Sequence, residues 1–234
     1  MKAHDEYLNI DYFMKQEADE FLFTFSAAED QRRLDQMLNN NPGLLNGKSG
    51  QYQNSLLHRA IEQNRLQTFI RKDLVSDTKC FRYGMCEYLL DEGAKHMSNI
   101  PGNTPFHLTC IFGGRKILSL LVKHGAELES RNIQGEYPLH LAANSGNIEA
   151  MTFLLEQGVN VETRGWKGNS ALHEAADNAH LDALRILMNT GLDVGVMNDD
   201  NETALHLAAG VSGEHGGVDV LDFLIAHGAD INAM

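Results

Sequence analysis

Short apolar clusters, separated by polar and glycine-containing segments, recur along the chain in two forms. The first form surrounds a histidine and occurs as NSLLHRA (54–60), NTPFHLT (103–109), EYPLHLA (136–142), NSALHEA (169–175) and ETALHLA (202–208). The second form precedes a polar segment and occurs as LLVKHGAELE (120–129), FLLEQGVNVE (153–162), ILMNTGLDVG (186–195) and FLIAHGADIN (223–232). The last four histidines, His107, His140, His173 and His206, are 33 residues apart. A fixed period of this length predicts a stack of repeated supersecondary units.

Each repeat carries the start and stop signals of two helices. A Thr or Ser ahead of the histidine is suited to cap the first helix, and a glycine after the second cluster is suited to a left-handed C-cap. These glycines are Gly93, Gly125, Gly158, Gly191 and Gly228. A tight turn follows with Gly102, Gly135 or Gly168, and in the last repeat Asn201 takes this place as the next best residue for a positive φ.

The period and both motifs resemble the ankyrin repeat family over about residues 21–234. The resemblance implies an all-α fold, an ankyrin repeat solenoid of stacked helix-turn-helix units with β-hairpin loops, in which each histidine bonds neighbouring backbone and the Thr of its own cluster. The implied domains are an acidic N-terminal extension (1–20), a degenerate capping repeat (21–53), a repeat with a 17-residue insertion (54–102), three regular repeats (103–135, 136–168 and 169–201) and a repeat that is incomplete at its C-terminus (202–234).

The insertion lies in the repeat 54–102, where His58 and Gly93 are 35 residues apart instead of 18. Its segment 65–82 contains five Lys or Arg and two Asp, in a chain of net charge −13. The apolar spacing of Leu66, Phe69, Ile70 and Leu74 predicts a prolonged first helix or a short extra helix, followed by a loop around residues 76–78. Two interpretations stay open, a tolerated loop insertion and a partner-binding or regulatory element.

Composition favours some kinds of partner and some cellular compartments over others. The acidic balance, with a pI of about 5.2, disfavours nucleic acid and favours basic proteins or peptides. The start of the chain lacks the apolar run of a signal peptide, and no eighteen uncharged apolar residues follow one another. Three cysteines, Cys80, Cys86 and Cys110, suit a reducing compartment. We therefore expect a soluble cytoplasmic protein, with the nucleus, or the host cytosol for an effector, as alternatives.

Two motifs resemble catalytic signatures and fail on their details. HEAAD (173–177) lacks the second histidine of a zinc helix, because Asp177 occupies its place. GVSGEHGG (210–217) lacks the Lys-Ser/Thr end of a phosphate loop, and we interpret it as a four-residue lengthening of an interhelical loop. We expect no catalytic residue, no metal site and no cofactor, and therefore no enzyme.

The resemblance also implies a concave groove lined by hairpin tips and first helices. The repeat register places the tips seven and six residues before the histidine, and first-helix groove positions four and five residues after it. The candidate partner-binding residues are Tyr52, Ile100, Ile111, Phe112, Ile133, Trp166, Lys167, Asp177, Asp199 and Asp200. Exposed apolar residues followed by acids predict a protein partner with an apolar anchor and basic residues.

The leading hypothesis is a non-catalytic protein-interaction module with a regulatory, adaptor or inhibitory role. One subclass resembles the inhibitor-of-NF-κB-like proteins, although the chain has neither a DSGxxS phosphodegron before the repeats nor an acidic PEST-like tail. A second alternative is a host-targeting effector of an intracellular bacterium or virus. A third is the ankyrin portion of a larger enzyme or channel truncated at Met234.

Overall fold

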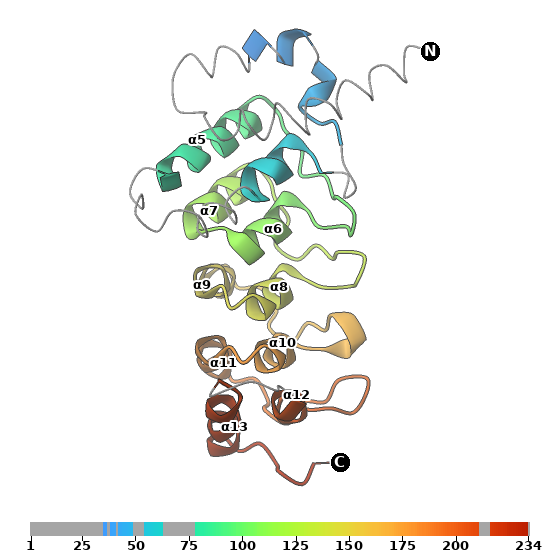
Figure 1. Cartoon of the computed structure of the whole chain (residues 1–234), viewed down its shortest axis with the longest axis vertical. Helices are drawn as coiled ribbons and strands as arrows, with labels where there is room; N and C mark the ends of the chain where they lie inside the picture. The colour runs from blue at the N-terminus through green and yellow to red at the C-terminus, as the bar shows by residue number, and fades with distance from the viewer. Residues whose placement is uncertain are drawn as a thin grey trace. The chain divides into compact units, whose positions relative to one another are not determined.

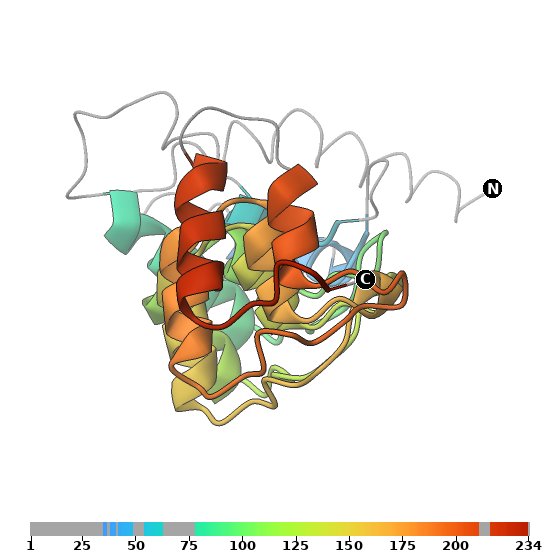
Figure 2. The ribbon, with the colours of Figure 1, turned by 90° about the horizontal axis from the view of Figure 1, so that it is seen from below.

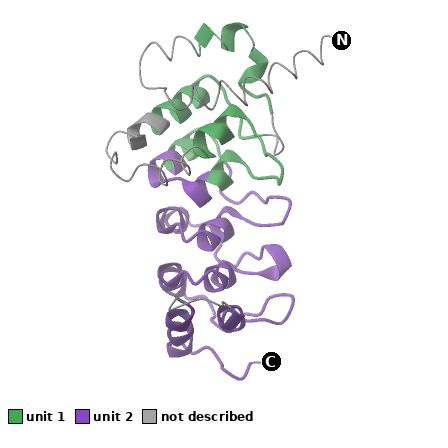
Figure 3. Cartoon of the chain, in the orientation of Figure 1, with its two compact units in different colours: residues 1–108, 119–126 green, residues 109–118, 127–234 purple. Residues whose placement is uncertain are grey.

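The computed structural model describes two compact units of the chain, coloured separately in Figure 3. Unit 1 comprises residues 1–108 and 119–126, and unit 2 comprises residues 109–118 and 127–234. The described residues are 35–36, 38–40, 42–48, 54–62, 78–210 and 216–233. The N-terminal extension, Tyr52 and most of the degenerate capping repeat lie outside them, as do residues 63–77 of the insertion.

The described elements are helices joined by short turns. In chain order they are a 3-10 helix η2 (Pro42–Leu44), a helix over residues 56–62, α5 (Thr78–Asp91), α6 (Pro105–Phe112), α7 (Arg115–Lys123), α8 (Pro138–Asn144), α9 (Ile148–Glu156), a 3-10 turn η3 (Trp166–Gly168), α10 (Ala171–Asp177), α11 (Leu181–Met188), α12 (Ala204–Gly210) and α13 (Gly216–Ala226). The described part of the chain contains no strand, and its expected hairpins are turns, one of which has an antiparallel bridge between Met197 and Thr203. The all-α repeat fold is thus confirmed. None of the described helices has the length and apolar content needed to cross a membrane.

Unit 2 has two layers of helices. The first helices of its repeats form one layer, in which α10 packs against α8 and α12. The second helices form the other layer, in which α11 packs against α9 and α13. Figures 1 and 2 show both layers, with the turns extending from the side of the first helices.

The two layers bury apolar residues of different size. Ala142, Ala143 and Ala175 on the first helices have no exposed surface, and such small side chains let adjacent helices approach closely. Leu154 and Leu187 on the second helices are also fully buried. Burial of each such leucine contributes about 1.5–3 kcal/mol of transfer free energy. Because buried residues of both layers recur in successive repeats, the core lies between the two layers and continues from repeat to repeat.

The helix C-termini have the predicted glycines, and one helix N-terminus differs from the prediction. The five C-cap glycines have φ between 75° and 93°, and Asn201 has φ 61°. Ser170 caps α10, as expected for a hydroxyl residue before the histidine. Tyr137 caps α8, however, so the prediction of Thr or Ser in every unit is wrong there. The start of α8 is stable without a hydroxyl because Pro138 has no backbone N–H and His140 Nδ1 accepts the Tyr137 N–H at 3.1 Å.

The insertion lengthens the second helix of its repeat. Helix α5 has 14 residues, whereas α7 and α9 have nine each. The predicted loop around residues 76–78 is therefore wrong at Thr78, which is the first residue of α5. The predicted prolongation of the first helix lies outside the described residues beyond residue 62.

Candidate protein-interaction surface

His140, His173 and His206 of unit 2 each join a first helix to the backbone beyond the second helix. His173 Nδ1 lies 2.8 Å from Ser170 Oγ, and His173 Nε2 lies 3.0 Å from the carbonyl oxygen of Glu202. His140 Nε2 lies 3.0 Å from the carbonyl oxygen of Thr163. These bonds confirm the structural role that the ankyrin resemblance implied for the histidines.

Burial determines the charge of these histidines. Desolvation lowers the pKa of His140 to about 4, against an opposing bond to the Thr163 carbonyl, and lowers the pKa of His58 to about 4 in unit 1. Burial also lowers the pKa of His173. The rings are neutral at pH 7 and both nitrogens of His173 are engaged, which leaves no free imidazole in the HEAAD segment.

Four-residue turns recur with the same period as the histidines. The N–H of the first residue donates to the carbonyl of the residue four positions later in each of the pairs Asn99 to Asn103, Asn132 to Glu136, Gly165 to Asn169 and Asn198 to Glu202, at 2.8 to 3.1 Å. The two middle residues of each turn are the tips predicted from the sequence: Ile100 and Pro101, Ile133 and Gln134, Trp166 and Lys167, Asp199 and Asp200. The register therefore located the tips correctly.

Asparagine side chains fix the shape of these turns. In unit 2, Asn198 Oδ1 accepts the N–H groups of Asp200 at 3.0 Å and Glu202 at 2.9 Å. Its Nδ2 donates to Asn169 Oδ1 at 3.0 Å, which connects the turn to the preceding repeat. Asn132 accepts two backbone N–H groups of its own turn in the same way. An Asn that bonds its own turn and its neighbour restricts the direction in which the tip residues point.

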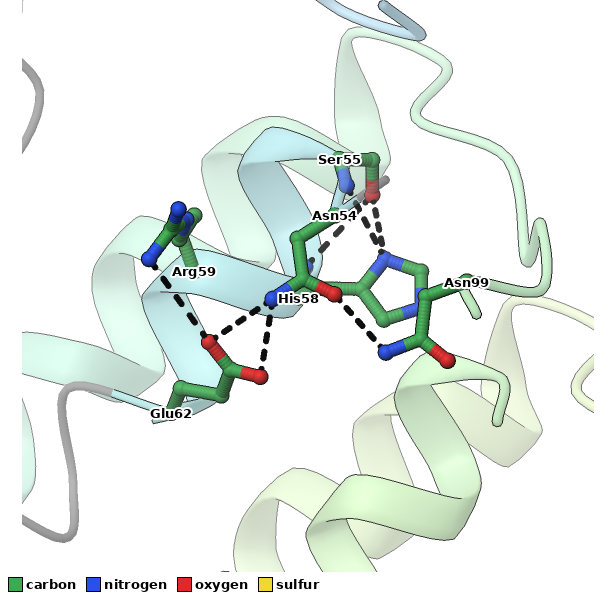
Figure 4. A network of polar contacts seen from close by, with 6 residues as sticks. All are labelled: Asn54, Ser55, His58, Arg59, Glu62 and Asn99. Carbon is green, nitrogen blue, oxygen red and sulfur yellow. Dashed lines mark hydrogen bonds and ion pairs between the residues drawn. The ribbon is translucent and has the colours of Figure 1, made fainter. Parts of the chain in front are cut away.

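In unit 1 the turn that carries Ile100 rests on a partly buried polar network (Figure 4). Asn99 Nδ2 donates to Asn54 Oδ1 at 2.7 Å. Asn54 Nδ2 in turn donates to both carboxylate oxygens of Glu62 at 2.9 Å, and Glu62 lies 4.0 Å from Arg59. The network thus holds the turn against the helix 56–62.

A buried carboxylate has the equivalent role in unit 2. Glu174 is 6% exposed, and it accepts hydrogen bonds from Asn144 Nδ2 and Asn169 Nδ2, each at 3.0 Å. The charge of Glu174 also acts on a second carboxylate, Glu136. The pKa of Glu136 is raised mainly by burial and further by the charge of Glu174, whereas the hydrogen bond from Asn132 lowers it. Sequence reasoning missed the roles of Glu174, Asn169 and Glu136. For Asn169 and Glu136 the available signal was an Asn or Glu four residues before every histidine of the repeats.

The turns 165–168 and 198–201 are bonded directly to each other. The N–H of Asp199 donates to the carbonyl oxygen of Lys167 at 2.9 Å, and Lys167 Nζ lies 3.1 Å from Asp200 Oδ2. Arg164 donates from one guanidinium nitrogen to the carbonyl oxygens of Met197 at 2.6 Å and Gly168 at 3.1 Å. Arg164 was absent from the predicted site, and nothing in the repeat register marks it.

The predicted apolar residues differ in exposure. Ile133 is 73% exposed and Trp166 is 54% exposed, both in unit 2, and Ile100 is 53% exposed in unit 1. Ile111 and Phe112, at the end of α6, are half-buried. Large apolar side chains at turn tips contribute little to the core, and exposed apolar surface of this kind is typical of an interaction site.

The predicted charged residues are all exposed and lie in unit 2. They are Lys167, Asp177, Asp199 and Asp200. Lys167 pairs with Asp200, whereas the Asp199 carboxylate of the adjacent turn has no such pair among the described residues. The exposed Arg164 is bonded to backbone carbonyls. That the surface forms a concave groove, and that these residues bind a partner, stay predictions.

Two comparisons relate the chain to known proteins. A family model described as ankyrin repeats (3 copies) matches residues 78–165 and 159–234, which include all the turns of unit 2. A comparison with curated proteins finds no match.

Proposed function

Because the chain belongs to the ankyrin repeat family, we propose that it is a non-catalytic protein-interaction module whose unit 2 binds a protein partner through its turn row, which we define as residues 132–135, 165–168 and 198–201. Ankyrin repeats generally bind protein partners and are generally non-catalytic. The binding surface includes the exposed Asp177 at the end of α10.

The observation that carries this proposal is the exposure of Ile133 and Trp166 at equivalent positions of two turns. Tryptophan is enriched in binding hot spots, where truncation to alanine costs about 2 kcal/mol or more. The turns are fixed by backbone and asparagine bonds instead of by these two side chains. A tip that is ordered before binding loses little conformational entropy when a partner docks.

The partner we propose has an apolar anchor and basic residues. Asp177, Asp199 and Asp200 supply acidic charge on the same unit as Trp166, and complementary charge speeds encounter and selects among partners. We propose a regulatory, adaptor or inhibitory role for this binding. We further propose a cytoplasmic location, supported by the three cysteines of the sequence, an odd and sparse set that suits a reducing compartment.

Affinity capture with matched variants tests this proposal. The whole chain is immobilised as wild type, as Trp166→Ala and Ile133→Ala, and as Val218→Ala, whose side chain is 59% exposed on α13. We expect the partners recovered by the wild type to be lost from the first two variants and retained by Val218→Ala. Equal recovery by all four proteins contradicts the proposed surface. Thermal unfolding followed by circular dichroism verifies that the variants remain folded.

A further inference from the structure

Trp166 and Asp199 occupy the same position in adjacent turns, each being the second residue of its turn. The carbonyl oxygen of Lys167, the residue bonded to Trp166, accepts the Asp199 N–H at 2.9 Å. Standard bond lengths then place the Cα atoms of Trp166 and Asp199 no more than about 11 Å apart. A methyl group at Gly168 would clash with the Asp199 carboxylate, so this carboxylate lies against the turn that carries Trp166.

The Asp199 carboxylate is available to a ligand. Lys167 Nζ pairs with Asp200, and within the described part of the chain no hydrogen bond or ion pair engages the Asp199 side chain. Asp199 is exposed, as is Trp166. An exposed tryptophan and an unpaired carboxylate therefore lie on two adjacent turns that are bonded together.

Resting on the proposed function, we propose that Trp166 and Asp199 form a two-point recognition site for an extended peptide segment. Trp166 packs against an aliphatic or aromatic side chain of the segment, and the Asp199 carboxylate binds a Lys or Arg of the same segment. An extended chain advances about 3.3 Å per residue, so a separation of at most about 11 Å corresponds to about three residues. The partner carries its apolar and basic residues within three positions of each other.

Arg164 is the positioning residue of this site. Its bond to the carbonyl oxygen of Met197 joins the segment before one turn to the segment before the next, and its bond to the carbonyl oxygen of Gly168 holds it to its own turn. The Lys167–Asp200 pair is exposed on both sides, and such pairs contribute little. Arg164 therefore supports the separation between Trp166 and Asp199 together with the backbone bond from Asp199 to Lys167, and with it the spacing that the site selects.

The experiment is a selection from a displayed library of random 12-residue peptides on the immobilised whole chain. The wild type is expected to enrich peptides with an apolar residue within three positions of Lys or Arg. Asp199→Asn is expected to keep the apolar preference and lose the basic one, whereas Asp182→Asn, a matched exposed aspartate on α11, behaves as wild type. Arg164→Gln is expected to broaden the spacing, and Arg185→Gln, an exposed arginine on the same helix as Asp182, leaves it unchanged.

Affinity of an enriched peptide follows from the fluorescence of Trp166, the single tryptophan of the chain. We expect Trp166→Ala, measured by calorimetry, to weaken binding about 30-fold. Asp199→Asn is expected to weaken it about two- to fivefold, with no further loss when the peptide Arg is also replaced by Gln.

The outcomes separate this inference from the proposed function. An unchanged basic preference in Asp199→Asn, with binding still dependent on Trp166, overturns the two-point site and leaves the turn row as the binding surface. Enriched peptides that depend on neither Trp166 nor Ile133 overturn the proposed function itself. Because Asp199 is exposed, its variant decides the question even if Arg164→Gln lowers stability.

Discussion

Acidification of the protein perturbs the histidines that join its repeats, and His140 gives the sharpest prediction. His140 Nδ1 accepts the N–H of Tyr137, so the ring must lack a proton at this atom for the bond to form. Burial lowers the pKa of His140 to about 4, whereas an unfolded histidine titrates near 6.5. A depressed histidine pKa means that stability is complete above pH 6.5 and is lost progressively as the pH falls toward 4.

The size of the loss follows from linkage. At pH 5 the unfolded chain has taken up a proton at His140 and the folded chain has largely not, which removes about 2 kcal/mol from the free energy of unfolding relative to pH 8. His58 in unit 1, with its pKa also about 4, has the same sign. Glu136 acts in the opposite direction, because its raised pKa favours protonation in the folded state.

Urea unfolding followed by circular dichroism at pH 8, 6.5 and 5 measures the effect. His140→Gln is less stable at pH 8, because it loses the bonds of the ring, but its free energy of unfolding should fall about 2 kcal/mol less between pH 8 and pH 5 than that of the wild type. Asn189→Ala, which replaces an exposed residue without a titratable group, is the control and should keep the wild-type dependence. An unchanged pH dependence in His140→Gln would refute the reasoning, because it would mean that the ring has the same pKa in the folded and unfolded states.

Three further predictions concern the turns and the core. Asn198→Ala should lower the free energy of unfolding by about 1–3 kcal/mol, because it removes bonds to two backbone N–H groups, and thermal unfolding against the exposed Asn189→Ala measures it. Gly168→Ala, with φ 71°, should cost more than about 1 kcal/mol and more than Gly158→Ala, which has open space around it, because only the first clashes with a neighbour. Cys110 should resist iodoacetamide in the folded protein at pH 8, since burial raises its thiol pKa, and mass spectrometry with and without urea shows when it reacts.

Each of these predictions has an opposite result that would count against it. Equal melting temperatures for Asn198→Ala and Asn189→Ala would mean that the asparagine does not hold its turn. Equal losses in Gly168→Ala and Gly158→Ala would mean that only the backbone conformation matters at residue 168. Rapid labelling of Cys110 without urea would mean that the core around α6 opens readily.

Local signals predicted the parts of the fold that depend on one residue type in one conformation. Positive φ at Gly158 and Asn201 follows from short-range chemistry that repeats every 33 residues. The histidine bonds of His173 were instead expected from the ankyrin resemblance, since one of them reaches Glu202, 29 residues away. The tip positions followed from the same register. The Tyr137 cap departed from the pattern because a proline and a histidine nitrogen together replaced the hydroxyl.

Contacts between repeats were not predictable in the same way. Arg164 reaches Met197, 33 residues away, and Asn144 reaches Glu174, 30 residues away, through side-chain directions that no spacing rule encodes. The lengthened α5 also escaped prediction, because apolar periodicity in a short segment does not distinguish an extension of the first helix from one of the second. The predicted domain boundaries and the binding role of the site residues stay predictions.

Site-specific photo-crosslinking tests the central claim, that unit 2 binds its partner through the turn row, most directly. A photoreactive phenylalanine derivative replaces Trp166 in one protein and Ile225, which is 46% exposed on α13, in another. After illumination in lysate, we predict crosslinked partner on the protein labelled at residue 166 and little at residue 225. Crosslinking at residue 225 with none at residue 166 would contradict the account.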